Sequence, residues 1–302
     1  MNKKSILRAT LLEIKERLEN ERNMNNNDIV KELQGRGYEA ESHEVIKNGV
    51  SMKGIIIRSN DPMTPILYTD DLIEMAEECG QGISDVADVL VKKYEQQKDI
   101  EIDVNQLMSR ETILSHIYIG LQKESSENIE KKSSEFEGLE SYLYVKHSTN
   151  GRDYSLKLSS KIMGAINLSS DEAWQHAERN TFADGETQIQ NVASMLSGMG
   201  YISDEAAETD LESDFPQLYV VTNRAKYRGA SAILDKAALK AFGKKHKTKK
   251  LAVIPSSIHE MLIIPYDEQV NLDELSLMVA EVNATQVEPE ERLADRAYLI
   301  EL

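Results

Sequence analysis

The segment from Leu251 to Pro265 constrains the fold of this chain more than any other part of the sequence. It contains two apolar runs, Leu251–Ile254 and Met261–Ile264, with a short polar insert between them. Short apolar runs of this kind are typical of buried strands, and their close spacing predicts a β-hairpin. The insert holds Ser256, Ser257, His259 and Glu260. Polar groups beside a core hairpin must be hydrogen-bonded, and such groups are often functional.

Two more hairpins are predicted by Asn-Gly pairs that separate apolar runs. Asn48-Gly49 lies within 44–59, and Asn150-Gly151 lies within 139–160. Both residue types tolerate positive φ, which a two-residue hairpin turn requires. Amphipathic helical patterns follow the hairpins, over 70–79, 83–94, 186–199 and after Asn271. We therefore expect an α+β fold of three hairpin-plus-helix blocks, with mostly antiparallel sheet and helices packed on the sheet faces.

The last predicted helix has a clear start and an apolar stripe. Asn271 and Glu274 have the spacing of an N-terminal cap. We expect the helix to bury one face, formed by Leu272, Leu275, Met278, Val279 and Val282.

The distribution of charge predicts a division into two lobes. Residues 122–138 are rich in charged residues and poor in large apolar ones. We expect an N-terminal lobe over 1–124 that begins with an amphipathic helix at 4–22. Residues 125–138 would form a charged linker or an exposed helix, and 139–302 a C-terminal α+β lobe that carries the Leu251–Pro265 hairpin.

Composition excludes several classes of protein. The formal net charge of −17 argues against nonspecific binding to nucleic acid or to an anionic membrane. No run approaches the ~18 apolar residues of a spanning helix, and the N-terminus does not resemble a signal peptide. Cys79 is the only cysteine, so neither an intramolecular disulfide nor a cysteine-based zinc site can form. We expect a cytoplasmic protein.

The insert Ser256, Ser257, His259 and Glu260 is the only candidate for chemistry. A serine could act as nucleophile with His259 as base. However, such pairs normally come from separate segments, and no oxyanion element is evident. In the alternative, structural interpretation, the serines bond the turn backbone while His259 and Glu260 satisfy one another or a neighbouring strand.

A second candidate is the loop after a predicted strand at 217–221. Asn223, Arg224 and Arg228 precede a helical pattern, and such a loop can bind an anion at the helix N-terminus. It can equally be an ordinary loop that Asn223 turns. The basic cluster 243–250 could contact phosphate or an acidic partner, although a solvated loop is favoured. No nucleotide motif or histidine ligand spacing occurs, so no cofactor and no metal are expected.

Several segments resemble a known family. These are VIKNGV (45–50), PILY (65–68), AERNT (177–181), YVVTN (219–223), PSSIHE (255–260) and VNATQVEPEERLAD (282–295). Together they resemble an uncharacterised family of Clostridia and other Firmicutes that is described only as a domain of unknown function. The chain departs from the family pattern at Gln286 and Ala294. The resemblance implies a bacterial cytoplasmic protein and is compatible with a gene on a mobile element. It assigns no catalytic role.

Three functional hypotheses remain at this stage. The first is a non-enzymatic binding or regulatory protein with an unknown protein partner. The second is a hydrolase or a small-anion-binding enzyme centred on the Ser256/Ser257/His259/Glu260 turn. The third is a mobile-element factor that engages host machinery through its acidic surface.

Overall fold

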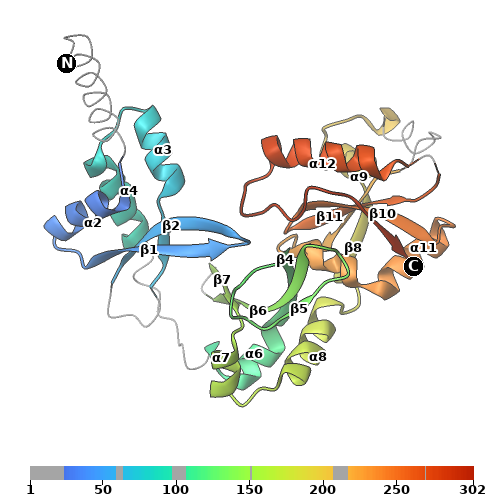
Figure 1. Cartoon of the computed structure of the whole chain (residues 1–302), viewed down its shortest axis with the longest axis horizontal. Helices are drawn as coiled ribbons and strands as arrows, with labels where there is room; N and C mark the ends of the chain where they lie inside the picture. Colours follow the sequence, from blue (N-terminus) through green and yellow to red (C-terminus); the bar gives the residue numbers. More distant parts are fainter. Residues whose placement is uncertain (1–23, 59–63, 97–106, 150–151, 207–216, 269) are drawn as a thin grey trace, which may run out of the picture. The chain divides into compact units, whose positions relative to one another are not determined.

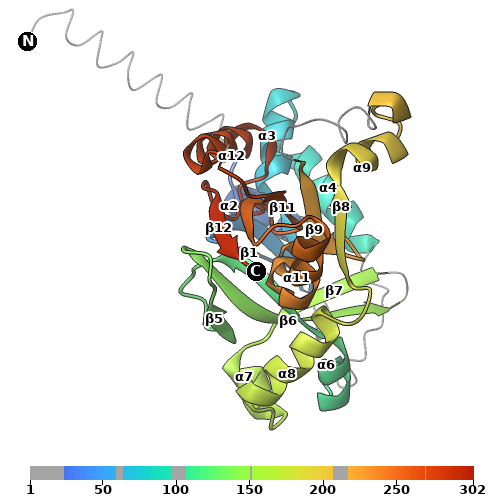
Figure 2. The same ribbon diagram turned by 90° about the vertical axis from the view of Figure 1, so that its right-hand side faces the viewer.

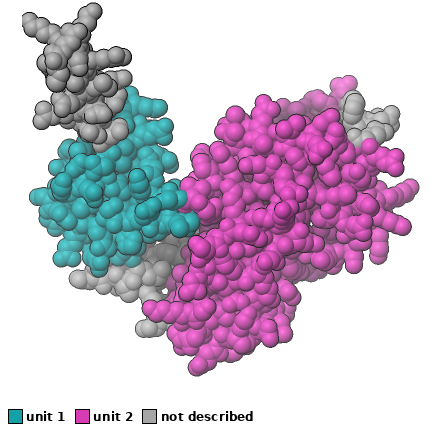
Figure 3. Space-filling view, in the orientation of Figure 1, with its two compact units in different colours: residues 1–47, 51–104 teal, residues 48–50, 105–302 magenta. Residues whose placement is uncertain are grey.

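The computed structural model describes residues 24–58, 64–96, 107–149, 152–206, 217–268 and 270–302. The chain divides into two compact units, which Figure 3 colours separately. Residues 1–47 and 51–104 form the first unit, and residues 48–50 and 105–302 form the second. The helix predicted over 4–22 and the turn predicted at Asn150-Gly151 lie outside the described residues.

The fold is α+β, as the sequence predicts, and its sheets are antiparallel where their registers are described (Figure 1). The first unit contains the three-stranded sheet β1-β2-β3, and the Asn48-Gly49 turn joins β1 to β2 with φ values of 48° and 79°. Its core includes Ile29, Leu33 and Ile55. Its elements are α2 (Asn26–Gly35), β1 (Ala40–Lys47), β2 (Val50–Ile57), β3 (Ile66–Tyr68), α3 (Asp70–Glu78) and α4 (Ile83–Glu95).

The second unit begins with a four-stranded sheet. Strand β6 (Leu139–Thr149) pairs with β4 (Ile117–Lys123), with β5 (Lys131–Ser133) and with β7 (Arg152–Lys157). One face of this sheet packs on α6 (Arg110–His116), α7 (Ser160–Ala165) and α8 (Ser170–Thr181). Buried Trp174 and Ala177 of α8 join aliphatic residues of the strands in this core.

The opposite face of the four-stranded sheet is polar and aromatic. Because side chains alternate along a strand, Ile117 and Ile119 point to the helices while Tyr118 points to the other side. Tyr118 pairs with Tyr144 across the strands, and Gly120 pairs with Tyr142. This second face, which also carries Gln122, Glu140, Lys146 and Lys157, is called the tyrosine face below.

A five-stranded sheet in the order β12-β10-β11-β9-β8 completes the second unit (Figure 2). The predicted hairpin is confirmed as β10 paired with β11, with Leu251 opposite Pro265 and Ile254 opposite Leu262. Leu251 and Val253 face one core, and Ala252 and Ile254 face another, which explains why both runs are apolar throughout. The elements are β8 (Thr187–Asn191), α9 (Val192–Gly198), β9 (Tyr219–Asn223), η1 (Gly229–Leu234), α11 (Lys236–Lys245), β10 (Lys250–Ser257), β11 (Glu260–Pro265), α12 (Leu272–Gln286) and β12 (Tyr298–Glu301).

Three sequence predictions need correction. Residues 125–138 are neither a linker nor an exposed helix, because they contain β5 and the buried side chain of Phe136. Strand β4 also pairs with β6, so the second unit begins before the predicted boundary at 124. The helix predicted over 186–199 starts only at Val192, because residues 187–191 pair with β9 instead.

The histidine at the end of α11 predicts a pH-dependent contribution to stability. His246 stacks on Phe242, with ring centroids 4.2 Å apart, and meets Tyr219 edge-on at 4.9 Å. Burial, with a smaller effect of Lys245, lowers the pKa of His246. The unfolded chain therefore binds this proton more readily, so the contribution is complete above about pH 6.5 and is lost as the pH falls below that value.

Replacing His246 with phenylalanine removes this titration and keeps an aromatic ring in the stack. We expect the free energy of unfolding of the wild type to fall relative to that of His246→Phe as the pH drops from about 7.5 to 5.5. The free energies of unfolding of the wild type and of His246→Phe are measured by denaturation, followed through the fluorescence of Trp174, the only tryptophan. A difference that does not change with pH would contradict the assignment.

Candidate functional site

The polar insert of the hairpin forms its tip. Ser256 and Ser257 are the last residues of β10, and Glu260 is the first of β11. The Ser257 hydroxyl accepts a hydrogen bond from the backbone N–H of His259 at 3.0 Å. The Ser256 hydroxyl donates to Glu260 at 3.4 Å. Ser257 therefore bonds the turn backbone, as the structural interpretation predicts, whereas Ser256 bonds the side chain of Glu260.

His259 connects the tip to two other segments. Its Nδ1 accepts a hydrogen bond from the backbone N–H of Arg228 at 3.2 Å, and its Nε2 lies 3.2 Å from a carboxylate oxygen of Glu291. Because Nδ1 accepts, the ring proton is on Nε2, where it is donated to Glu291. Among the described residues, no serine hydroxyl bonds to either ring nitrogen. The imidazole thus holds the loop that contains Arg228.

The two candidate segments of the sequence therefore meet. Strand β9 pairs with β11, Val221 opposite Met261, and this register places the loop after β9 beside the hairpin tip. The Thr222 hydroxyl donates to the His259 carbonyl at 2.8 Å. Asn223 turns the loop through its side chain, which donates to the Tyr227 carbonyl at 2.8 Å and accepts from the Tyr227 N–H at 3.2 Å. Arg224 is exposed on this loop.

The backbone of this loop is strained and crowded. Lys226 and Arg228 have φ values of 52° and 50°, in the left-handed region, which costs a non-glycine residue about 1–2 kcal/mol. The next residue, Gly229, is buried, and a Cβ atom there would lie 2.6 Å from the Asn223 nitrogen and 2.7 Å from the His259 oxygen. Strain of this kind persists only where the surrounding structure fixes it, and it is common at binding sites.

The strained backbone aims the Arg228 guanidinium at the tyrosine face. Its Nη1 donates to the Tyr142 hydroxyl, and its Nε donates to the Tyr227 hydroxyl at 3.2 Å. Its carbon lies 5.3 Å from the centroid of the Tyr144 ring and 5.5 Å from that of Tyr227. Arg228 forms no ion pair with any described residue. Among the described residues, this half-buried charge is therefore balanced only by tyrosine rings and hydroxyls.

A glycine on β4 sets the position of Tyr142. A Cβ atom at Gly120 would lie 2.5 Å from the Tyr142 ring, so the ring can lie across β4 only because residue 120 has no side chain. Tyr142 is 1% exposed, and its hydroxyl is fixed beneath Arg228.

Two lysines of the four-stranded sheet are neutralised by carboxylates. Lys157 pairs with Glu127 at 2.6 Å, and Lys131 pairs with Glu140 at 3.1 Å. Burial alone would raise the pKa of Glu140, but hydrogen bonds from Gln122, Ser125 and Lys131 outweigh it and lower the pKa. Arg228 thus differs from these two lysines, because no carboxylate of a described residue pairs with it.

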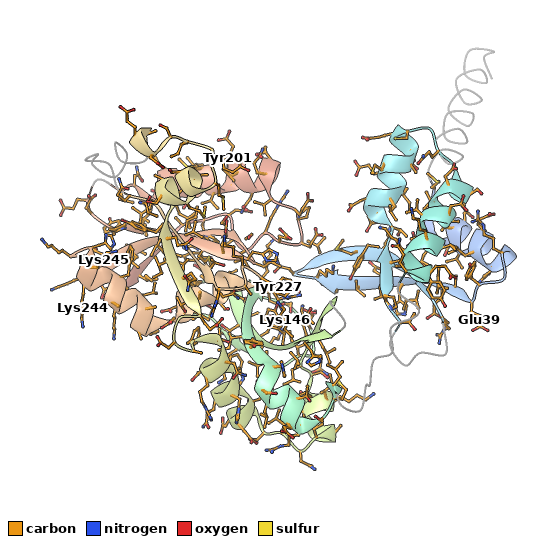
Figure 4. All side chains as sticks on the ribbon, turned by 180° about the vertical axis from the view of Figure 1, so that it is seen from behind. Glu39, Lys146, Tyr201, Tyr227, Lys244 and Lys245 are labelled. Atoms are coloured by element: carbon orange, nitrogen blue, oxygen red, sulfur yellow. The ribbon has the colours of Figure 1, made fainter. Side chains whose placement is uncertain are left out.

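A cavity of about 300 Å³ lies between the tyrosine face and the loop after β9. Arg228 does not line it, but the guanidinium contacts the rings of Tyr144 and Tyr227, which do. Its lining includes Tyr118, Tyr144, Lys146, Tyr227, Asn223 and Glu186. The ammonium group of Lys146 lies 4.8 Å from the centroid of the Tyr227 ring, and Figure 4 labels both side chains. The volume is at the lower end of the range for ligand pockets, so it suits a small molecule.

The two sides of the cavity differ in electrostatics. Burial would raise the pKa of Tyr227, but Arg228, followed by the Ser155 hydrogen bond and Lys146, outweighs it and lowers the pKa. The Tyr227 hydroxyl donates its proton to Ser155 at 3.3 Å. Burial raises the pKa of Tyr118, and nearby Glu186 raises it further. The Lys146–Tyr227 side thus attracts negative charge, and the Glu186–Tyr118 side repels it.

The sequence predicts only part of this site. Arg228 and Asn223 belong to the predicted binding loop, whereas Lys146 and the tyrosines of β4 and β6 were not singled out. One signal could have found them: aliphatic residues alternate with Tyr118 on β4, and with Tyr142, Tyr144 and Lys146 on β6. A strand with aliphatic residues on one face and tyrosines on the other indicates a second, specialised surface.

Three other features of the described residues bear on the site. They contain no group of three or more histidine, cysteine, aspartate or glutamate side chains placed to hold a metal ion. None of their helices has the length and apolar character needed to cross a membrane. The lysines of the basic cluster 243–250 are exposed, and Lys250 pairs with Glu301 at 3.2 Å.

The chain belongs to a family of unknown function, DUF5688, whose model matches residues 22–301. This match confirms the resemblance drawn from the PSSIHE and VNAT segments to a domain of unknown function. No curated protein and no solved structure gives a significant match to the chain.

Proposed function

We propose that the protein is a non-enzymatic binding protein that takes a small anionic molecule into the cavity beside Arg228. The observation that carries this proposal is the half-buried Arg228 guanidinium, which forms no ion pair with any described residue. Desolvating a charge is costly unless it is compensated. An anion in the adjoining cavity would supply the missing negative charge, in a chain whose overall charge is otherwise strongly negative.

The cavity wall supports a specific orientation of the ligand. The Lys146 ammonium provides donors on one side, and Arg228 adds positive charge from behind the Tyr144 and Tyr227 rings. The Tyr118 and Tyr144 rings, with centroids 5.9 Å apart, offer flat apolar surface beside them. A planar molecule with a carboxylate or phosphate fits this arrangement when its charged end faces Lys146 and points away from Glu186.

Support for a non-enzymatic role comes from the hairpin tip. A serine hydrolase needs a hydrogen bond between the nucleophile and its base. Both ring nitrogens of His259 are engaged, with Arg228 and Glu291, and the hydroxyls of Ser256 and Ser257 bond within the turn. We propose that this cluster positions Arg228 rather than a substrate. We also expect a bacterial cytoplasm as the compartment, since the single cysteine fits it.

The test uses benzoate and benzamide, which have almost the same shape and differ in charge. In ligand-detected NMR titrations we expect benzoate to bind the wild type about tenfold more tightly, because a partly buried charge contact is worth about 1.4 kcal/mol or more. Replacing Lys146 with glutamine should remove most of this preference. The control is Lys161→Gln, an exposed lysine of α7 in the same unit, which should retain it.

Two results would overturn the proposed function. Equal affinity of the wild type for benzoate and benzamide would mean that the cavity does not select for negative charge. An unchanged preference in Lys146→Gln would place benzoate outside the cavity.

A further inference from the structure

The outer face of α12 exposes large apolar side chains. Leu277 is 73% exposed, Met278 is 58% exposed and Val282 is 45% exposed. Met278 and Val282 were predicted from the sequence to belong to the buried stripe, and this part of the prediction is wrong. The helix is apolar around most of its circumference, so its composition does not determine which side is buried.

Hydrogen bonds fix the rotation of α12 on its sheet. Asn283 is 2% exposed, and its side chain donates to the Ala294 carbonyl at 3.1 Å and to Asp295 at 2.7 Å. The Ser276 hydroxyl accepts from the Ala297 N–H at 3.0 Å, and Val279 packs among Ala252, Ile254 and Ile264. Turning Leu277 inward would break these bonds and bury polar groups without partners, so the exposed face is a stable feature.

Two carboxylates flank the exposed apolar residues. Glu274, Leu277, Met278 and Glu281 follow the spacing i, i+3, i+4 and i+7, which places them on one side of a helix. Both glutamates are exposed, and neither carboxylate forms an ion pair with another described residue. The surface made by Glu274, Leu277, Met278, Glu281 and Val282 is called the α12 face below.

We propose that the α12 face binds an amphipathic, basic helix of a partner protein. Apolar side chains of that helix would cover Leu277, Met278 and Val282, and its lysines or arginines would pair with Glu274 and Glu281. A second copy of this chain fits less well, because two such faces would bring glutamates against glutamates. One helix face buries little area, so the complex would be of the weak, transient class.

The test uses a short fluorescent helical peptide of leucine and lysine in amphipathic order, with a glutamate version of the same peptide. Fluorescence anisotropy on the full chain should show binding of the lysine peptide that weakens with salt, and weaker binding of the glutamate peptide. We expect the double variant Leu277→Ser/Met278→Ser to bind the lysine peptide about tenfold more weakly than the wild type, or weaker still. We expect the same loss of affinity in Glu274→Lys/Glu281→Lys. The matched control is Asp171→Lys/Glu178→Lys on α8, which has the same spacing, exposure and charge change.

The outcomes separate the possible occupants. Equal losses in the α8 and α12 charge variants would show that the peptide senses net charge, and this would overturn the proposal. No binding of the lysine peptide would overturn it too. Concentration-dependent dimerisation that Leu277→Ser/Met278→Ser abolishes would replace it with self-association. Benzoate binding does not involve the α12 face. A negative result with the peptides would therefore leave the proposed anion site in the cavity unaffected, and the benzoate titrations test that site separately.

Discussion

Replacing Gly229 with alanine is expected to lower the free energy of unfolding by more than about 3 kcal/mol, among the larger effects of a single substitution. A Cβ atom at this position would lie 2.2 Å from the Thr222 hydroxyl oxygen, 2.6 Å from the Asn223 nitrogen and 2.7 Å from the His259 oxygen. The last two are backbone atoms, held by the β9–β11 pairing, so they cannot move aside cheaply. Denaturation followed by Trp174 fluorescence measures the change.

The control for this prediction is Gly164→Ala in α7. No atom lies within 4 Å of a Cβ added there, and alanine is the better helix former, so stability should stay equal or rise slightly. If Gly229→Ala were as stable as Gly164→Ala, the tight approach of the loop to the hairpin tip would be wrong. A folded Gly229→Ala protein should also lose its preference for benzoate, because Arg228 follows the loop.

The second large effect concerns Arg228, and it separates binding from stability. In the double variant Arg228→Met/Tyr142→Phe, the guanidinium and its buried hydroxyl partner are removed together. Replacing both partners of a buried polar contact with apolar groups often leaves stability nearly unchanged. Here the replacement also removes the charge of Arg228, which has no carboxylate partner among the described residues. We therefore expect the free energy of unfolding to stay within about 1 kcal/mol of the wild type.

The same double variant should lose benzoate affinity by at least about tenfold, since the positive charge behind the Tyr144 and Tyr227 rings of the cavity wall is gone. The single change Tyr142→Phe should leave most of the affinity intact, because it keeps the guanidinium. A large loss of stability with unchanged benzoate binding would mean that Arg228 serves the fold and not a ligand.

The sequence predicts both the hairpin and the binding loop after β9, but it does not predict the contact between them. His259 and Arg228 are 31 residues apart, and their contact depends on the pairing of β9 with β11. Local patterns do not encode that register. The sequence also leaves the role of His259 open, because the partners of its two nitrogens, Arg228 and Glu291, come from other segments.

The tyrosine face escaped prediction for a different reason. Residues 125–138 appear linker-like because of their charge, yet Glu127 neutralises Lys157, and Lys131 of β5 neutralises Glu140. Charges paired across strands resemble solvated charges when only their positions in the sequence are known. Likewise, the orientation of α12 follows from the hydrogen bonds of Asn283, a polar residue that an apolar pattern ignores.

The most direct test of the central claim is a crystal structure of the full chain with 4-bromobenzoate, in which anomalous scattering locates the bromine. We expect the molecule in the cavity, with its carboxylate within hydrogen-bonding distance of Lys146 and turned away from Glu186. A carboxylate bound instead to the exposed lysines of α11, such as Lys244 and Lys245 in Figure 4, would contradict the claim. So would a molecule in the cavity with its charged end toward Glu186.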